Sequence, residues 1–291
     1  MTGVVMAGGR PAADRVSRVV RRVAASPSGA VGGVLTALVV VLIILSVVHV
    51  FGDPIAQDSA VSLQGPSFAH PFGTDRFGRD VLSRCAAGLA NSALVSVVAV
   101  AFATVVGTAA GLVAGFFRSA PDRVIGGLTN ILFAFPPLLL ALALASAFQR
   151  TWLTIAVAIG VVYIPIFVRV TRGPVLSLRE ADFVRAATVL GMSRLRVLFG
   201  HVLPNIGSIV IVQVTLSLSW AVLTEASLSF LGLGTPPPAP SLGSMVFDAS
   251  TLVYIAPWTM IAPGAVLVVF VVGLNLLGDG LRDALDPKNR G

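Results

Sequence analysis

The chain has 291 residues, of which 56% are hydrophobic and 11% are charged. A soluble domain carries roughly 25% charged residues, so this composition excludes an ordinary soluble protein and predicts that lipid surrounds most of the chain. The net charge of +7 comes from basic residues in short segments between long apolar runs, so it does not indicate a nucleic-acid partner. The single cysteine excludes an internal disulfide and a cysteine-based metal cluster, and the three histidines are too dispersed to suggest a metal site.

The first 30 residues are expected to form a basic tail in the cytoplasm. Four valines recur with the spacing of one helix face, and arginines lie between and around them: Val16, Val19, Val20 and Val23. This pattern is typical of a short amphipathic helix that lies on the inner leaflet of a membrane. The alternative is a partly disordered arm.

Six apolar segments then follow that are long enough to cross a bilayer, which needs about 20 residues. They are roughly 31–51, 89–115, 125–148, 152–170, 205–232 and 258–278. Because backbone polar groups have no water partner inside a bilayer, these segments must be helical. If the N-terminus is cytoplasmic, sixteen of the twenty Lys and Arg residues fall on the cytoplasmic side. This bias predicts that both termini are cytoplasmic.

Charged residues gather in the outer segment between the first two spans. Their signs alternate around turns at two glycines, and they include Asp75, Arg76, Arg79, Asp80 and Arg84. One interpretation is a docking surface for a substrate-binding protein. The other is pairing among themselves, since exposed charges are commonly only solvated.

Glycines and prolines mark several of the spans. Gly107, Gly111 and Gly115 repeat every four residues, which predicts close helix packing. Pro136 and Pro137 lie within the third predicted span, where they could kink the helix or serve packing alone.

The longest cytoplasmic connection, residues 171–204, is predicted to form a helix, a glycine turn and a second helix. Residues 177–180 have the form of a capping box, Gly191 can adopt the left-handed conformation of a helix end, and Ser193 can cap the next helix. Two apolar stripes accompany this pattern: Phe183, Ala187 and Leu190 in the first helix, and Leu195, Leu198, Phe199 and Val202 in the second. A rigid unit of this kind could transmit force from a soluble partner. The alternative is an interfacial hairpin that only covers the helix ends.

Glu225 is the only acidic residue within a predicted span. An ionised carboxylate is costly in a bilayer and often marks a functional site. Here it could belong to an outer gate, or it could be a buried partner for a neighbouring helix.

The cytoplasmic connection contains a spaced set of residues, namely Ala186, Ala187, Gly191, Leu203 and Pro204. At this spacing they resemble the EAA loop of importers of the ATP-binding-cassette (ABC) type. Arg185 stands where the family has Glu, and His201 stands where it has Ile. The segments 70–84, 225–234 and 278–287 resemble those of dipeptide, oligopeptide and nickel permeases, so the likeness covers nearly the whole chain after residue 30.

This resemblance implies an all-α integral membrane protein with the MetI-like fold of type I ABC importers, six transmembrane helices and cytoplasmic coupling helices. The first transmembrane helix and an outer segment would occupy residues 31–88, the permease core 89–281 and a cytoplasmic tail 282–291. The residues implied in coupling to an ATPase are Asp182, Phe183, Arg185, Ala186, Ala187, Gly191, Met192, Ser193, Leu203 and Pro204.

The resemblance also implies partners in a bacterial cytoplasmic membrane. They would be a second permease subunit, two cytoplasmic ATPase domains that carry ATP and magnesium, and an extracytoplasmic substrate-binding protein that delivers cargo, with peptides as the default. The chain has no phosphate-binding loop of its own, so it is expected to be no enzyme and to bind no cofactor. The alternative function is a self-sufficient secondary transporter or channel, although such proteins usually show several ionisable groups within spans or repeated halves.

Overall fold

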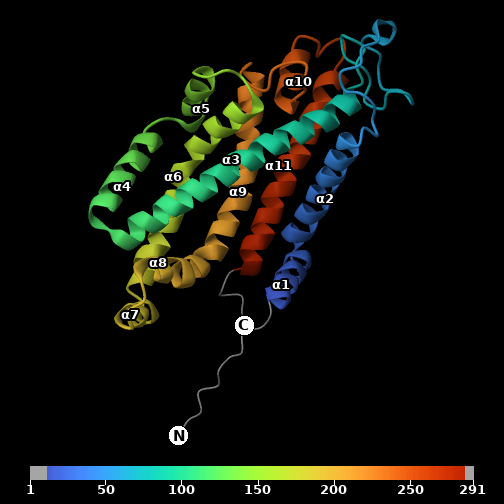
Figure 1. Ribbon diagram of the computed structural model, residues 1–291. Helices are drawn as coiled ribbons and strands as arrows, with labels where there is room; N and C mark the ends of the chain where they lie inside the picture. Colours follow the sequence, from blue (N-terminus) through green and yellow to red (C-terminus); the bar gives the residue numbers. More distant parts are fainter. Residues whose placement is uncertain (1–11, 286–291) are drawn as a thin grey trace.

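The computed structural model describes residues 12–285, and this part of the chain is helical without any strand. Five long apolar helices could each cross a membrane, and the bent pair α4–α5 makes a sixth span if it is counted as one. Helices α1, α7 and α8 lie at the lower end of the bundle in Figure 1, and α5, α10 and residues 48–80 lie at its upper end. The helices are α1 (Ala12–Ala25), α2 (Pro27–Val47), η1 (Ser59–Val61), α3 (Val81–Phe117), α4 (Ser119–Phe133), α5 (Pro137–Ser146), α6 (Trp152–Arg179), α7 (Asp182–Val189), α8 (Arg194–Val197), η2 (Leu198–Val202), α9 (Leu203–Phe230), α10 (Leu242–Ala249) and α11 (Trp258–Leu285).

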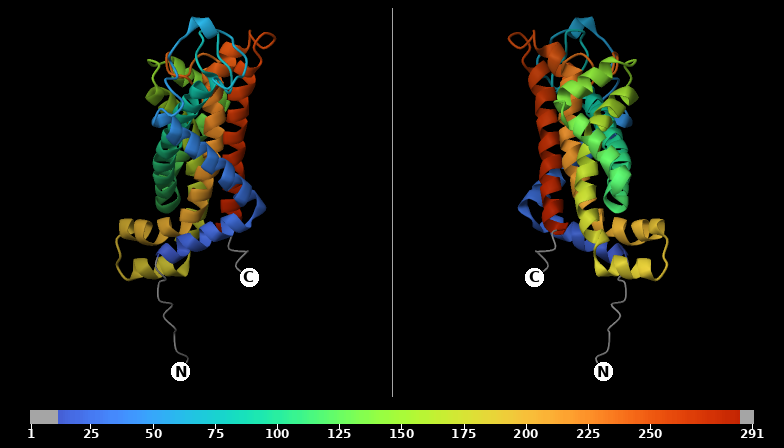
Figure 2. Two further views of the ribbon diagram at one scale, coloured as in Figure 1. Left: turned by 90° about the vertical axis from the view of Figure 1, so that its right-hand side faces the viewer. Right: turned by 90° about the vertical axis from the view of Figure 1, so that its left-hand side faces the viewer.

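The centre of the bundle is the tight packing of α3 on α6. A Cβ atom added at Gly107, Gly111 or Gly115 would come within 2.5–2.8 Å of atoms in α6. The glycine stripe therefore lets the two backbones approach closely, as the sequence predicts. On the other side of the bundle α11 packs along α2, and the views in Figure 2 show α1 lying across the lower end.

Residues 12–25 of the N-terminal tail form the helix α1, as the amphipathic pattern predicts, whereas its place on the inner leaflet stays a prediction. The side chains of Val19 and Val23 are half-buried, whereas Val20 is exposed. Residues 1–11 of the predicted tail lie outside the described residues, as do residues 286–291 of the predicted C-terminal tail. Residues 282–285 continue α11.

The third predicted span, residues 125–148, is broken in two, because α4 and α5 meet at an angle of 92°, so the kink is the interpretation of Pro136 and Pro137 that the structure supports. Pro136 precedes α5 with an extended ψ of 128°, and Pro137 is the first residue of that helix. Proline disfavours the helical conformation in the residue that precedes it, and proline has no backbone N–H to donate to the helix hydrogen bonds. The proline pair therefore breaks this span, whereas Pro165 and Pro263 lie inside the uninterrupted helices α6 and α11.

The predicted capping box at residues 177–180 is also wrong. Helix α6 runs on to Arg179, and Glu180 follows as its last, C-terminal cap residue. Val175 is fully buried there and Leu178 packs against the same core, so apolar contacts extend the helix beyond the predicted span of 152–170. The predicted boundary between residues 88 and 89 likewise falls inside α3.

Candidate functional site

Residues 180–202 form a compact helical unit, the α7–α8 unit, at the lower end of the bundle (Figure 1). Helix α7 ends in a left-handed turn at Gly191, whose φ is +80°. The amide of Gly191 donates to the carbonyl of Thr188 at 3.0 Å, and the amide of Met192 donates to that of Ala187 at 3.1 Å. This is the double hydrogen bond of a Schellman motif. Ser193 then caps α8 by accepting from the amide of Arg196 at 3.4 Å, so the predicted helix, glycine turn and helix are confirmed.

The α7–α8 unit shares one apolar core with three long helices. Its Val184, Val197 and Val202 are buried in this core. The same core contains buried residues from α3, α6 and α9, namely Leu112, Phe116, Val175 and Ile206. Because close-packed cores deform little, a displacement of the unit must move the lower ends of these three helices with it.

Of the predicted apolar stripe of α7, only Ala187 is buried. Phe183 and Leu190 are 45% and 82% exposed, whereas Val184 and Ala187 turn inward. In the second helix only half of the stripe is buried, with Leu198 and Val202 inside. Five large apolar side chains of the unit, the exposed apolar set, are therefore left open: Phe183, Val189, Leu190, Leu195 and Phe199. Exposed apolar groups concentrated on one small unit indicate an interaction site.

The charged groups of the unit form a short chain of ion pairs. Arg185 donates to Glu180 at 2.9 Å, and Arg118 at the end of α3 lies 3.6 Å from the same carboxylate. The hydrogen bond from Arg185, assisted by the charges of Arg118 and Arg179, lowers the pKa of Glu180. Arg185 thus pairs with Glu180 rather than with Asp182, which lies exposed in the first turn of α7.

The remaining predicted coupling residues lie in or beside the same unit. Ala186 is exposed and Ala187 is buried on α7, and Met192 packs partly buried against the shared core. Leu203 and Pro204 are the first two residues of α9, which continues from η2 without a turn. Proline is a helix breaker and would favour a turn into the fifth span, but Pro204 lies within this continuous run, directly after the π-helical η2.

Glu225 lies in α9 and is fully buried. The hydroxyl of Ser229, one turn further on, donates to Glu225 Oε1 at 2.7 Å. This bond lies within α9, and Oε2 of Glu225 is buried without a hydrogen-bond partner among the described residues, so both interpretations of Glu225 stay predictions.

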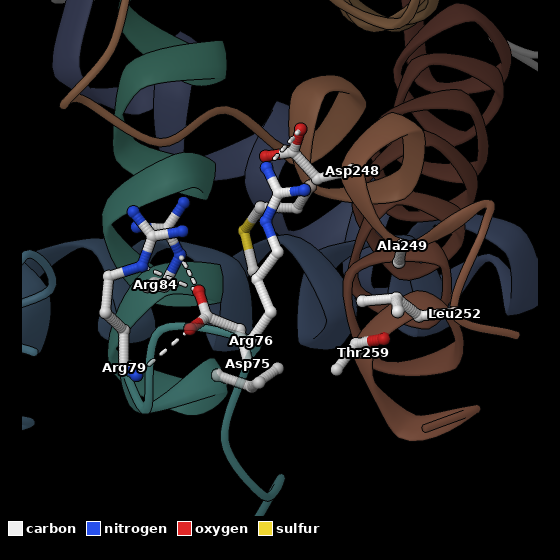
Figure 3. A pocket seen from close by; sticks show the side chains of 10 residues that line it. Asp75, Arg76, Arg79, Arg84, Asp248, Ala249, Leu252 and Thr259 are labelled. Carbon is white, nitrogen blue, oxygen red and sulfur yellow. Dashed lines mark hydrogen bonds and ion pairs between the residues drawn. The ribbon is translucent and has the colours of Figure 1, made fainter. Parts of the chain in front are cut away.

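At the upper end, four of the five charged residues of the predicted docking surface pair locally, among them Arg84, which lies 3.5 Å from Asp75. Arg79 lies 2.7 Å from Asp75, and Asp80 caps α3 while it lies 2.9 Å from His70. Arg76 differs, because its side chain is 50% exposed and only approaches Asp248 at 3.9 Å. Figure 3 shows this cluster beside α10 and α11.

Sequence reasoning did not find the partners that join distant segments. Arg172 of α6 donates to both carboxylate oxygens of Asp122 in α4, at 2.6 and 2.8 Å. Arg179 donates to the carbonyl of Phe116 at 2.9 Å and so joins the ends of α6 and α3. The sequence shows only that Arg172 and Arg179 lie in the C-terminal part of a helix. Tertiary packing decides which residue each of them contacts.

Comparison with known proteins identifies the family. Residues 107–291 match the family described as binding-protein-dependent transport system inner membrane component. The chain belongs to this family. It is therefore a multi-pass protein of the bacterial inner membrane and a permease component of an ABC transporter.

Several curated relatives share most of their length with this chain. The dipeptide transport system permease protein DppC of Alkalihalophilus pseudofirmus is 44% identical over 226 residues, which cover 78% of this chain and 74% of the relative. The glutathione transport system permease protein GsiD of Pectobacterium atrosepticum is 39% identical, with 77% and 75% covered. The dipeptide transport system permease protein DppC of Haemophilus influenzae is 37% identical, with 89% and 90% covered.

Proposed function

We propose that this permease component imports peptides, that it forms half of a translocation path with a second permease subunit, and that two ATPase subunits drive it by docking on the α7–α8 unit. The observation that carries this proposal is the two-sided construction of the unit. Its inner side shares a core with α3, α6 and α9, while its outer side presents the exposed apolar set. Peptides are proposed as cargo because the relatives are named as permeases for dipeptides and for glutathione.

The exposed apolar set supplies the contact with the ATPase. Leu190 and Val189 are 82% and 86% exposed beside the Gly191 turn, at the part of the unit where α7 ends. Burying such side chains in a partner releases roughly 25 cal/mol per Å² of apolar surface. Arg194 and Arg196 are exposed around them, so the docking surface of the partner is expected to be acidic between its apolar groups.

The shared core then carries the motion into the membrane. When ATP binding brings the two ATPases together, each pulls on its α7–α8 unit. Because Val184, Val197 and Val202 are packed against Phe116, Val175 and Ile206, the lower ends of α3, α6 and α9 follow. Hydrolysis releases the ATPases and lets the helices return. The proposed orientation places the lower end in the cytoplasm and the upper end on the side of the binding protein.

The test is a charge placed in the exposed apolar set. In a Leu190→Asp variant of the complete transporter, we expect the ATPase subunits to be lost on purification in mild detergent, and ATP-driven peptide uptake by proteoliposomes to fall at least tenfold. Ile255→Asp is the matched control, because Ile255 is 68% exposed between α10 and α11 at the other end of the bundle. Undiminished uptake in the Leu190→Asp variant would refute the docking site. Uptake by this chain alone, driven by an ion gradient, would refute the ABC mechanism altogether.

A further inference from the structure

A cavity of about 540 Å³ lies at the upper end of the bundle. Its walls come from residues 57–84, from the proline-rich loop 235–239, from the end of α9 and from α10. Four arginines line it: Arg76, Arg79, Arg84 and Arg150. Of the described residues in its walls, Asp248 is the acidic one. The volume lies within the range of about 300–1,000 Å³ that is usual for small-molecule sites.

The arginines outnumber the carboxylates that could neutralise them. Arg79 and Arg84 share a single carboxylate, with their Nε atoms 2.7 and 3.5 Å from Asp75 Oδ2. Figure 3 shows the two guanidinium groups side by side next to Asp75. Neither is well solvated, because their side chains are only 12% and 6% exposed. Two adjacent cations that share one anion leave a positive charge that bulk water screens weakly.

The other two arginines add to this excess. Arg76 approaches Asp248 only to 3.9 Å, and Arg150 donates to the carbonyl oxygen of Gly232 at 2.7 Å instead of to a carboxylate. The four guanidinium groups thus face two carboxylates, Asp75 and Asp248. Pairing within the chain leaves about two positive charges at the wall of the cavity.

The aromatic ring of Phe77 holds two of these groups in place. The guanidinium carbons of Arg76 and Arg79 lie 4.8 and 4.6 Å from the centre of that ring. Stacking on an aromatic face is a favourable geometry for arginine and restricts its motion. Phe77 and Phe247 also line the cavity, so the positive wall adjoins apolar surface.

We propose that this cavity is a carboxylate site that receives the acid group of the cargo on its way into the translocation path. Arginine binds carboxylates through two parallel hydrogen bonds, and a desolvated excess of guanidinium favours such an anion. Arg79 and Arg84 lie recessed in the cavity rather than on a protruding surface, which fits a small molecule better than an acidic patch of a protein. The proposal rests on the proposed function, because it needs the upper end to face the incoming cargo.

The test is equilibrium binding of a radiolabelled alanyl dipeptide and of its C-terminal amide to the purified transporter in nanodiscs, without ATP or binding protein. The unmodified complex is expected to bind the free acid about tenfold more tightly than the amide, as one charge-assisted contact allows. Arg79→Gln should abolish this preference, and so should Arg76→Gln, whose half-exposed site tolerates substitution if the first variant fails to fold. Arg123→Gln, an exposed position on α4, is the matched control and should keep the preference.

Each result decides a different question. If the unmodified complex binds no dipeptide or does not distinguish acid from amide, or if both cavity variants keep the preference, the carboxylate site is refuted. If the variants instead weaken attachment of the binding protein and leave the acid preference unchanged, the arginines dock a protein and the proposal is likewise overturned. Uptake of the same dipeptide into proteoliposomes tests the proposed function separately. If the complex prefers the acid but shows no ATP-driven uptake, only the proposed import mechanism is refuted.

Discussion

Gly191 occupies a backbone conformation that residues with a Cβ atom rarely adopt. Its φ is +80°, and an added Cβ would meet no atom within 4 Å. Glycine is therefore favoured at this position by the backbone conformation alone, and not by close contacts with neighbouring atoms. The two hydrogen bonds of the turn fix the angle between α7 and α8, and with it the arrangement of the exposed apolar set.

Replacing Gly191 with alanine should loosen the α7–α8 unit. The left-handed conformation costs a residue with a Cβ about 1–2 kcal/mol, so we expect the melting temperature of the purified complex to fall by about 2–8 °C. ATP-driven uptake should fall further than stability, because the docking surface loses its geometry.

The matched control is Gly207→Ala in α9. An alanine there would also meet no atom within 4 Å, and the backbone is helical, so we expect unchanged or slightly higher stability. Equal melting temperatures for the two variants would show that the turn at Gly191 is not needed.

Single residues were predictable where the signal is local. Gly191 and Ser193 act within a few residues of their own positions, so spacing alone reveals a turn and a cap. Pairing among the charged residues at 75–84 was one of two interpretations, but the sharing of Asp75 by Arg79 and Arg84 was not predicted, and the pairing of Arg172 with Asp122 bridges 50 residues. Such pairs depend on where the packed helices place their side chains, which no local pattern encodes.

At the scale of elements, the contact of α3 with α6 depends on the absence of side chains. A Cβ at Gly111 would lie 2.7 Å from both Thr171 Cβ and the carbonyl oxygen of Val168. Neither atom can move away without displacing α6, because both belong to its buried face. The spacing of the glycines predicted this contact, whereas the partner helix could be named only from the structure.

Gly111→Ala should separate α3 from α6. Overpacking of this kind costs about 1–3 kcal/mol, so we expect the melting temperature of the complex to drop by several degrees. Thermal aggregation followed by size-exclusion chromatography measures the change. Gly126→Ala in α4 is the control, because its added Cβ would meet no atom within 4 Å. If the Gly111→Ala complex were as stable as the control, the contact between α3 and α6 would not require a glycine at this position.

Two element boundaries show why sequence patterns mislead within a bilayer. Residues 177–180 have the side chains of a capping box, yet the burial of Val175 and the packing of Leu178 carry α6 through them. Conversely, hydropathy runs without interruption through residues 125–148, whereas Pro136 and Pro137 break the helix. Hydropathy reports where a segment lies, but continuity of a helix depends on backbone chemistry and on packing.

For the molecule as a whole, both ends of the bundle carry arginines, but the arginines are arranged differently. The lower end carries Arg118, Arg185 and Arg196 on short, tightly packed connections. The upper end gathers its arginines around the cavity beside α10, where two of them share Asp75. We therefore expect the ATPases to act on the α7–α8 unit at the lower end, and the cargo to arrive at the cavity at the opposite end.

This arrangement requires the lower end to be cytoplasmic, as the distribution of basic residues predicts. Introduced cysteines can test the orientation, since the one native cysteine, Cys85, is buried and should stay unlabelled. Thr251 lies exposed after α10 at the upper end, and Ala120 lies exposed at the start of α4, next to the lower end of α3. In intact spheroplasts, a membrane-impermeant maleimide should label Thr251→Cys and should label Ala120→Cys only after the membrane is permeabilised. The reverse pattern would place the α7–α8 unit outside the cell, where no ATPase could reach it, and the proposed mechanism would then fail together with the entry route for cargo.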